Sequence, residues 1–145
     1  MDDPTITAVS GDDPALTSAL AEAGLPTDDL HEPGRRFFRF SDRAGLIGFI
    51  GWERAGDVAL LRSLVVLPAR RGQGWGRAML GWAMLQLAEG GVTDAYLLTT
   101  GIERLAARLG FATIGRSSAP PAVRASRQFK SLCPSSAILM HRRLP

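Results

Sequence analysis

The chain has 145 residues, a length that suits one domain and leaves no room for two independent hydrophobic cores. Hydrophobic residues make up 46% of the sequence, which is enough to fill one core, and the formal net charge is +3. No apolar run reaches the roughly 20 residues that a membrane-spanning helix needs, so the sequence predicts a single domain over residues 1–145 with no membrane partner.

The N-terminus and the rare residue types narrow the functional classes further. The opening segment MDDPTITAVSGDDP is acidic and lacks the basic and apolar parts of a signal peptide, which predicts a cytoplasmic protein. Cys133 is the only cysteine, and His31 and His141 are isolated, so we expect neither an internal disulfide nor a metal site. The arginines are scattered, which favours a small anionic ligand over nucleic acid as the partner.

The first predicted elements are a short strand and a helix. The alternation in TITAV predicts a strand over residues 5–9. A helix is expected within residues 12–24, because Asp13 can cap it, Pro14 fits its first turn and Gly24 can end it. Four apolar residues recur at helical spacing and are expected to face the core: Leu16, Ala19, Leu20 and Ala23.

A three-stranded meander follows a polar, turn-rich loop. Two short apolar runs around a polar turn, residues 35–40 and 46–53, predict a β-hairpin. Residues 58–68 form the longest apolar stretch of the chain, interrupted only by Arg62 and Ser63. Such a run is typical of a central strand that is covered on both faces.

The second half of the chain alternates helices and strands. Residues 77–89 have helical spacing and end at two glycines, and residues 94–100 predict a strand. The spacing of Thr100 and Glu103 matches a capping box that would open a helix over residues 103–110. The core-facing stripe of the first of these helices is expected to be Met79, Leu80, Ala83, Met84 and Leu87.

Two further strands and a short helix complete the chain. Residues 111–116 and 137–144 predict strands, and Pro120 and Pro121 are placed to begin a short helix between them. The order of elements is βα, a three-strand meander, αβαβ and a final strand. This order indicates an α+β sandwich that is built on a mixed sheet.

The turn after the central strand carries the strongest chemical signal. In RRGQGWGRAML, Arg71 precedes Gly74 and Gly76, and a helical stretch follows. A helix start leaves about four backbone N–H groups without partners, and glycines let an anion approach them closely. An arginine beside them adds charge-assisted hydrogen bonds, so the turn predicts a cradle for a pyrophosphate. The alternative is that the glycines only make a tight connection.

Two other phosphate-binding motifs do not fit this turn. A P-loop ends in Gly-Lys-Ser/Thr, and the turn contains no lysine. The dinucleotide fingerprint G-x-G-x-x-G would start at Gly72 and Gly74 but would place its third glycine at Arg77. The turn instead resembles R/Q-x-x-G-x-G/A, with Arg71, Gly74 and Gly76 at the matching positions. That pattern is the cofactor signature of the GNAT superfamily, the acyl-CoA-dependent N-acetyltransferases.

The resemblance to the GNAT superfamily extends beyond the turn. RLGF, at residues 108–111, is similar to the LGF that ends the superfamily's next helix, and the likeness covers residues 58–116. It implies the GNAT fold, an α+β fold with a mixed, mostly antiparallel sheet of six to seven strands and helices on both faces. Four separate stretches (AGLPTDDL, ALLRSLVV, LLTT…RLGF and FKSLCPSSA) resemble the arsenic-resistance-operon branch, the ArsN-type acetyltransferases.

The family fold implies how acetyl-CoA, the expected co-substrate, would lie on this chain without a metal. The pyrophosphate would sit on the turn, the pantetheine beside the central strand, and the thiol arm near the end of the next strand. The implied residues are Arg71, Gly72, Gln73, Gly74, Trp75, Gly76 and Arg77 in the turn, Leu64, Val65 and Val66 in the strand, and Thr99 and Thr100 at the thiol arm. Trp75 would either cover the helix start or pack against the adenine.

The usual proton-transfer residues of the family are missing from this sequence. Many members have a glutamate early on the central strand as base and a tyrosine before LGF as acid. The matching positions hold Leu60 or Leu61, and Ala106. Glu53 is a candidate replacement base, or else a solvated carboxylate, and the Val66 N–H is a candidate donor to the tetrahedral oxyanion. Positioning alone can also supply roughly 7–11 kcal/mol of the barrier in favourable cases.

The acceptor side is expected in the loop before the hairpin, on the central strand and before the last strand. Its candidate residues are Asp28, Asp29, Arg62, Arg127 and Ser131. The alternative for the two aspartates is a solvated or capping role. Arg62 is either half of a buried salt bridge, with Glu53 as a possible partner, or an anion clamp for a substrate carboxylate or arsonate-like group, because an unpaired charge in an apolar strand is costly.

Two functions fit these observations. The first is an enzyme that transfers acetyl from acetyl-CoA to the amine of a small, anionic or arsenical amino-acid-like acceptor. The second is a non-catalytic acyl-CoA-binding sensor or scaffold, and a basic nucleic-acid-binding domain is a weaker third. Cys133 is interpreted as a small structural residue, since no histidine lies nearby in sequence to activate a covalent acetyl-cysteine. A homodimer is expected only by analogy with such folds.

Overall fold

The molecule, seen here in a computed structural model, is described over residues 3–132 and 136–145. Its strands form one sheet in the order β1-β2-β3-β4-β5-β7-β6. β4 and β5 are parallel and the other neighbouring strands are antiparallel, which confirms the mixed, mostly antiparallel sheet of an α+β fold. The strands are β1 (Thr5–Val9), β2 (Arg35–Asp42), β3 (Gly45–Ala55), β4 (Val58–Val66), β5 (Asp94–Thr99), β6 (Ala112–Ile114) and β7 (Ile138–Arg143).

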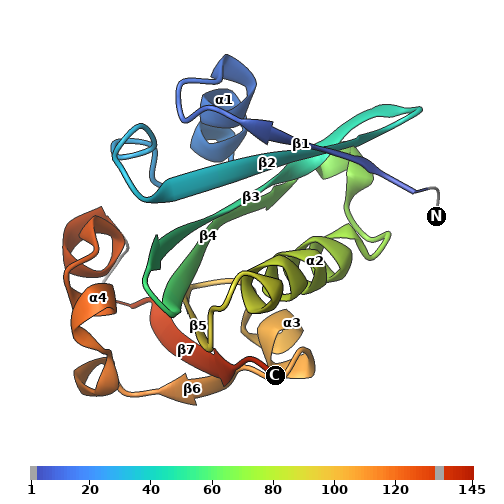
Figure 1. The fold of residues 1–145 in the computed structure, drawn as a ribbon. Coiled ribbons are helices and arrows are strands. Elements are labelled where there is room, and N and C mark those ends of the chain that lie inside the picture. The colour runs from blue at the N-terminus through green and yellow to red at the C-terminus, as the bar shows by residue number, and fades with distance from the viewer. Residues whose placement is uncertain (1–2, 133–135) are drawn as a thin grey trace.

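Helices cover both faces of this sheet (Figure 1). α1 and α4 lie on one face, and α2 and α3 lie on the other. The helices are α1 (Pro14–Glu22), α2 (Trp75–Glu89), α3 (Glu103–Arg108) and α4 (Pro121–Arg124), with shorter helical turns η1 (Pro68–Arg70), η2 (Arg116–Ser118) and η3 (Gln128–Leu132). The longer elements confirm the predicted order, whereas the sequence patterns did not indicate the short turns.

Alternation of side chains along the strands builds a hydrophobic layer on each face of the sheet. On β3, Phe49 packs in a cluster with Leu16 and Leu20 of α1. Ile50, the next residue, points the other way and belongs to the larger cluster that contains Met79 and the rest of the predicted α2 stripe. The sheet is therefore buried from both sides at its centre, where β4 lies.

The two ends of α1 agree only in part with the prediction. The Asp13 side chain caps the helix by accepting a hydrogen bond from the Ala15 N–H, as predicted. Ala23 was expected in the core but is exposed. The reason is that α1 ends at Glu22, so Ala23 is the C-cap residue and no longer lies on the buried stripe.

The starts of α2 and α3 also differ from the prediction. α2 begins at Trp75, before the predicted start at residue 77, because Gly74 takes the N-cap position in a left-handed conformation with φ of 87°. The capping role predicted for Thr100 is wrong. Thr99 Oγ instead accepts the N–H groups of Gly101 and Ile102, at 3.0 and 2.9 Å, because Thr99 ends β5 directly below that turn.

A β-bulge interrupts β4 in the middle of the sheet. Gly51 of β3 lies opposite Arg62, and Phe49 lies opposite Val65, so β4 carries one residue more than β3 across this interval. Ser63 within the bulge has φ of 59°, and it is the only non-glycine residue with positive φ among the residues described. For an L-residue this conformation costs about 1–2 kcal/mol.

β4 and β5 separate immediately before the bulge. Their parallel pairing runs from Val58 and Asp94 to Leu61 and Leu97, and no pairing between the two strands continues beyond it in the described chain. β5 goes on to Thr99 along β7 alone. The edge of β4 after Leu61 is therefore open on the side that faces β5.

Candidate functional site

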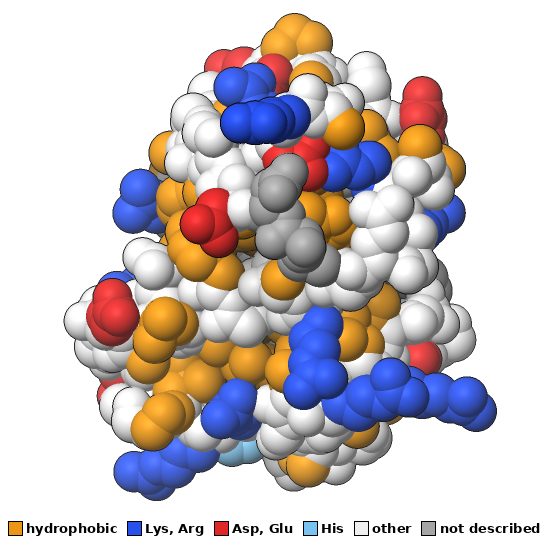
Figure 2. Space-filling model, turned by 90° about the vertical axis from the view of Figure 1, so that its right-hand side faces the viewer, with side chains coloured by type: hydrophobic (Ala, Val, Ile, Leu, Met, Phe, Trp, Pro, Cys, Tyr) orange, Lys and Arg blue, Asp and Glu red, His pale blue; other side chains and the backbone are white. Residues whose placement is uncertain are grey.

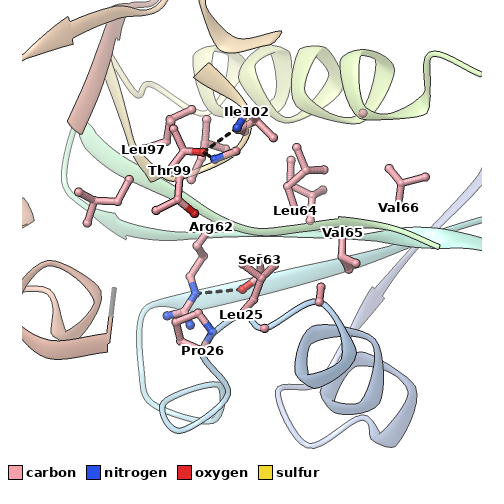
Figure 3. Close-up of a pocket in the computed structure, with 18 of the residues that line it drawn as sticks. Leu25, Pro26, Arg62, Ser63, Leu64, Val65, Val66, Leu97, Thr99 and Ile102 are labelled. Carbon is pink, nitrogen blue, oxygen red and sulfur yellow. Dashed lines mark hydrogen bonds between the residues drawn. The ribbon is translucent and has the colours of Figure 1, made fainter. Parts of the chain in front are cut away.

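A cleft of about 920 Å³ occupies the space where β4 and β5 separate. Leu64 and Val66 point from β4 toward α2, whereas Arg62, Ser63 and Val65 point toward the side of α1 (Figure 3). The cleft thus has a strand edge along its length, the start of α2 near one end and the loop after α1 near the other. Its lining residues include Gly24, Leu25, Pro26, Thr27, Asp28, Leu61, Arg62, Ser63, Leu64, Val65, Val66, Arg71, Gly76, Leu80, Leu97, Thr99, Thr100 and Leu105.

The glycine turn at one end presents free backbone donors. Within the described residues, none of the N–H groups of residues 72–77 has a backbone hydrogen-bond partner. Gly72 and Gly74 both have left-handed φ values, 77° and 87°, which only glycine adopts without strain. A Cβ at Gly76 would lie 3.3 Å from Leu105 Cδ2, so this position also favours glycine. The turn therefore fits a phosphate group at the start of a 15-residue helix.

Positive side chains surround this end of the molecule. Arg71 and Arg77 flank the glycine turn and are exposed, and so are Arg104 and Arg108 on α3. Figure 2 shows Lys and Arg side chains over both the upper and the lower part of the face on the side where α2 begins. These charges add a long-range attraction for an anion to the local donors of the turn.

The last residue of β4 is oriented by its neighbours. The Leu67 N–H donates to Ile47 O on β3, at 2.9 Å. Since successive N–H groups of a strand point to opposite sides, the Val66 N–H points away from β3 and toward the open edge. On the same side, Arg71 Nε donates to Val66 O at 2.9 Å, which ties the strand end to the glycine turn.

The opposite end of the cleft rests on a cluster of buried charges. Arg62 Nη1 and Nη2 lie 2.6 and 2.7 Å from the two carboxylate oxygens of Asp29, a bidentate pair whose side chains are both fully buried. Arg62 Nη1 also lies 2.9 Å from Glu53 Oε2, and Arg35 Nη2 lies 2.8 Å from Asp29 Oδ2. Ser126 Oγ donates to Glu53 Oε1 at 3.0 Å. We call these five residues the Arg62 cluster.

The Arg62 cluster decides between the two predicted roles of Arg62. The buried salt bridge with Glu53 is confirmed, and Asp29 is a second partner that the sequence did not indicate. Asp29 was given a solvated or capping role as one alternative, and this alternative is wrong because the carboxylate is buried. Arg62 and Arg35 carry two positive charges against the two negative charges of Asp29 and Glu53, so the cluster is balanced in charge without a ligand.

The electrostatics of Asp29 follow from these contacts. Burial acts to raise the pKa of this carboxyl, but the hydrogen bonds and positive charges of Arg62 and Arg35 outweigh it. The net effect lowers the pKa of Asp29 from 3.8 to about 2. Asp29 is therefore ionised throughout the physiological range and keeps the cluster neutral.

We expect stability to depend on Asp29 at acid pH. Because the pKa is lower in the folded state, the contribution of Asp29 is complete above about pH 4 and is lost as pH falls from about 4 to about 2. Urea unfolding of the wild type and of Asp29→Asn at several pH values measures this. The free energy of unfolding should converge between the two proteins as pH falls through that window. A constant difference would contradict the assignment.

The structure does not bring the other residues predicted for the acceptor site and for the base together at one place in the cleft. Asp28 is exposed and lines the cleft. Glu53 does not line the cleft but sits behind Arg62. Arg127 forms an ion pair with Glu32 on the loop after α1. Ser131 lies in η3, but its side chain and Cys133 are outside the described part of the structure.

Of three residues predicted for the cofactor, Trp75 and Thr99 have side chains with other partners, and Thr100 has none within the described part of the chain. The Trp75 ring is 3% exposed and belongs to the hydrophobic core beside α2, which favours the reading that it covers the helix start over packing against adenine. Thr99 lines the cleft, but its hydroxyl already accepts two N–H groups. Thr100 lines the cleft and is exposed.

Three residues of this region were not singled out by sequence reasoning. Arg35 and Ser126 complete the Arg62 cluster, and Ser63 lines the cleft beside it. The signal for Ser63 was its place next to a charge within an apolar strand. Nothing in the sequence indicated Arg35 or Ser126, because they reach the cluster from distant segments.

Two features of other classes of protein are absent from the described residues. In residues 3–132 and 136–145, no helix is long and apolar enough to cross a membrane. The same residues contain no group of three or more His, Cys, Asp or Glu side chains that could hold a metal ion.

Solved structures with the same fold include acetyltransferases. N-acetylglutamate synthase from Neisseria gonorrhoeae, complexed with coenzyme A and N-acetyl-glutamate, matches with a TM-score of 0.78 and 20% identity, over 100% of this chain and 36% of that chain. Rv2747 from Mycobacterium tuberculosis, in complex with CoA, has a TM-score of 0.74 and 15% identity, over 98% and 100%. The ribosomal-protein-S18-alanine N-acetyltransferase from Escherichia coli has a TM-score of 0.68 and 19% identity, over 98% and 94%.

These likenesses define the class as the GNAT fold, a fold of acyl-CoA N-acyltransferases. The chain spans about a third of the length of the Neisseria synthase, and no curated protein sequence matches it. A family model described as an acetyltransferase (GNAT) domain matches residues 33–113, which is more than half of the chain. The protein therefore belongs to the GNAT acetyltransferase domain family.

Proposed function

We propose that this protein is an N-acetyltransferase that moves the acetyl group of acetyl-CoA to the amine of a small acceptor. The observation that carries the proposal is the cleft between β4 and β5, which joins unpaired N–H groups of residues 72–77 at one end to an open strand edge along its length. A ligand that has a diphosphate at one end and an arm with two amide groups fits such a cleft. Family membership supports the same reading.

Acetyl-CoA would supply the activated acyl group as a thioester. The residues that would hold it are the glycine turn for the diphosphate and Leu64 to Val66 for the amide arm. The Val66 N–H points to the open edge, and it was predicted to donate to the oxygen that gains charge during transfer. Because Val66 O accepts a hydrogen bond from Arg71 beside the glycine turn, this N–H would instead bind the amide arm. Asp28 lines the cleft and would be available as a proton acceptor there, whereas Glu53 does not line it and would act only through an intervening group.

For the acceptor we propose a small amine with an acid group, that is, an amino-acid-like compound. Support comes from the Neisseria neighbour, whose structure holds N-acetyl-glutamate, and from the resemblance of four stretches to the ArsN-type branch. An arsenical amino acid is therefore one member of the acceptor class to test. A cytoplasmic location and a homodimer stay predictions.

The alternative function is binding of acyl-CoA without transfer. The observation that favours it is that apolar residues occupy the positions where many GNAT members have the glutamate base and the tyrosine acid. Leu60 and Leu61 are 3% exposed and Ala106 is fully buried. None of these side chains can carry a proton.

The test is a titration followed by an acceptor screen. We expect acetyl-CoA to give measurable heat in calorimetry and to raise the melting temperature. Release of free CoA thiol is then followed with a panel of amines, including amino acids with a second acid group. Binding with thiol release supports the transferase, and binding without release supports the sensor. Absence of binding would contradict both.

A further inference from the structure

Ser63 has a hydroxyl whose surroundings are unusual for a buried serine. It is 8% exposed, lines the cleft and sits in the bulge of β4 with φ of 59°. A glycine would adopt this conformation without strain, so the chain keeps a side chain where the backbone disfavours one. Strain of this kind is concentrated at functional sites, and this points to a use for the hydroxyl.

Arg62 fixes how this hydroxyl can bond. The bulge places two consecutive side chains on the same side of β4, and Arg62 Nε donates to Ser63 Oγ at 3.1 Å (Figure 3). A guanidinium has donors only, so it cannot accept the hydroxyl proton. The Ser63 O–H must therefore donate elsewhere, and no acceptor for it exists among the described residues.

Ser63 precedes Val66, the residue that Arg71 ties to the glycine turn, so the hydroxyl lies in the part of the cleft away from that turn. The glycine turn occupies the other end, so a ligand with its diphosphate there directs its acyl end toward Arg62 and Ser63. Leu25 and Pro26 of the loop after α1 line the same cleft as Ser63 (Figure 3). The Ser63 side chain thus faces a partly apolar part of the cleft, and its own O–H is a hydrogen-bond donor without an acceptor among the described residues.

We propose that Ser63 is a specificity-determining residue, whose hydroxyl donates a hydrogen bond to a carboxylate oxygen of the acceptor. This inference rests on the proposed function and sharpens it, because it selects amino acids over amines that lack the carboxylate. Arg62 acts as a positioning residue: it is held on three sides by Asp29, Glu53 and the Ser63 hydroxyl, and it turns that hydroxyl toward the cleft.

The test compares each amino acid with the matching amine that lacks the α-carboxylate. The measured quantity is the ratio of kcat/KM for the two acceptors, in wild type, Ser63→Ala and Ser63→Gly. A hydrogen bond to a charged group is worth a factor of about 10 or more, so the ratio should fall about tenfold in both variants. The KM for acetyl-CoA should not change, since the hydroxyl does not belong to the diphosphate end.

The two variants separate a specificity role from a structural one. Ser63→Gly also relieves the strain at φ of 59°, so it should melt at a higher temperature than Ser63→Ala. If Ser63 were only structural, the variants would differ in melting temperature while the acceptor ratio stayed at the wild-type value, and the inference would be overturned. Wild-type protein that transfers acetyl to none of the panel would overturn the proposed function as well, whereas an unchanged ratio with active protein overturns the Ser63 assignment alone.

Discussion

Replacement of Gly74 by aspartate removes measurable binding of CoA, whereas replacement by asparagine weakens it much less. Gly74 is the N-cap of α2 with φ of 87°, and asparagine and aspartate both tolerate this left-handed conformation better than other residues. The two side chains have nearly the same size, so the comparison isolates the charge. The aspartate carboxylate would occupy the donors that a diphosphate needs and would repel it.

Calorimetry with CoA measures the affinity of both variants, and their melting temperatures report whether the fold is intact. Two unit charges about 4 Å apart interact by about 4 kcal/mol near a protein surface, which corresponds to roughly a thousandfold loss of affinity. Equal affinities for the aspartate and asparagine variants would show that the diphosphate does not lie at this turn.

Replacement of Arg62 by methionine destabilises the fold by about 3 kcal/mol, the lower end of the range for breaking a buried ion pair. The loss leaves Asp29 and Glu53 with one cation fewer in a buried setting, although Arg35 still contacts Asp29. Urea unfolding at neutral pH measures the change. Arg39→Met is the matched control, because Arg39 has no ion pair within the described chain, and it should change stability by under about 1 kcal/mol.

A double variant makes the Arg62 prediction more specific. In Arg62→Met with Asp29→Asn, the buried carboxylate is removed together with its partner, so the loss should be smaller than the sum of the two single losses. Strict additivity would mean that Asp29 and Arg62 do not stabilise each other. The difference from additivity therefore measures their coupling directly.

The order and type of the main elements could be predicted from the sequence because their patterns are strong. The apolar run of β4, interrupted only by Arg62 and Ser63, is typical of a strand covered on both faces, and the stripe of α2 has the helical period that burial of one face requires. The ends of the elements were less certain, because they depend on single hydrogen bonds. Thr99 and Thr100 are both threonines, so either could cap the next turn. Thr99 does so because it is the last residue of β5.

Only one end of the site, the glycine turn, could be predicted from the sequence. The glycine turn is a continuous motif, so its conformation follows from neighbouring residues. The Arg62 cluster is different, because its partners come from separate parts of the chain and share no spacing. The bulge at Ser63 depends on the register between β3 and β4, which no property of β4 alone determines.

The wide separation of the Arg62 cluster along the chain has a consequence for the order of folding. Asp29 and Arg62 are 33 positions apart, and Glu53 and Ser126 are 73 apart. Contacts of such range form only after long loops have closed, so they arise late compared with a helix or a hairpin. During synthesis, the Arg62 cluster cannot be completed until Ser126 has left the ribosome. The glycine turn needs only residues that leave the ribosome before Ser126 does.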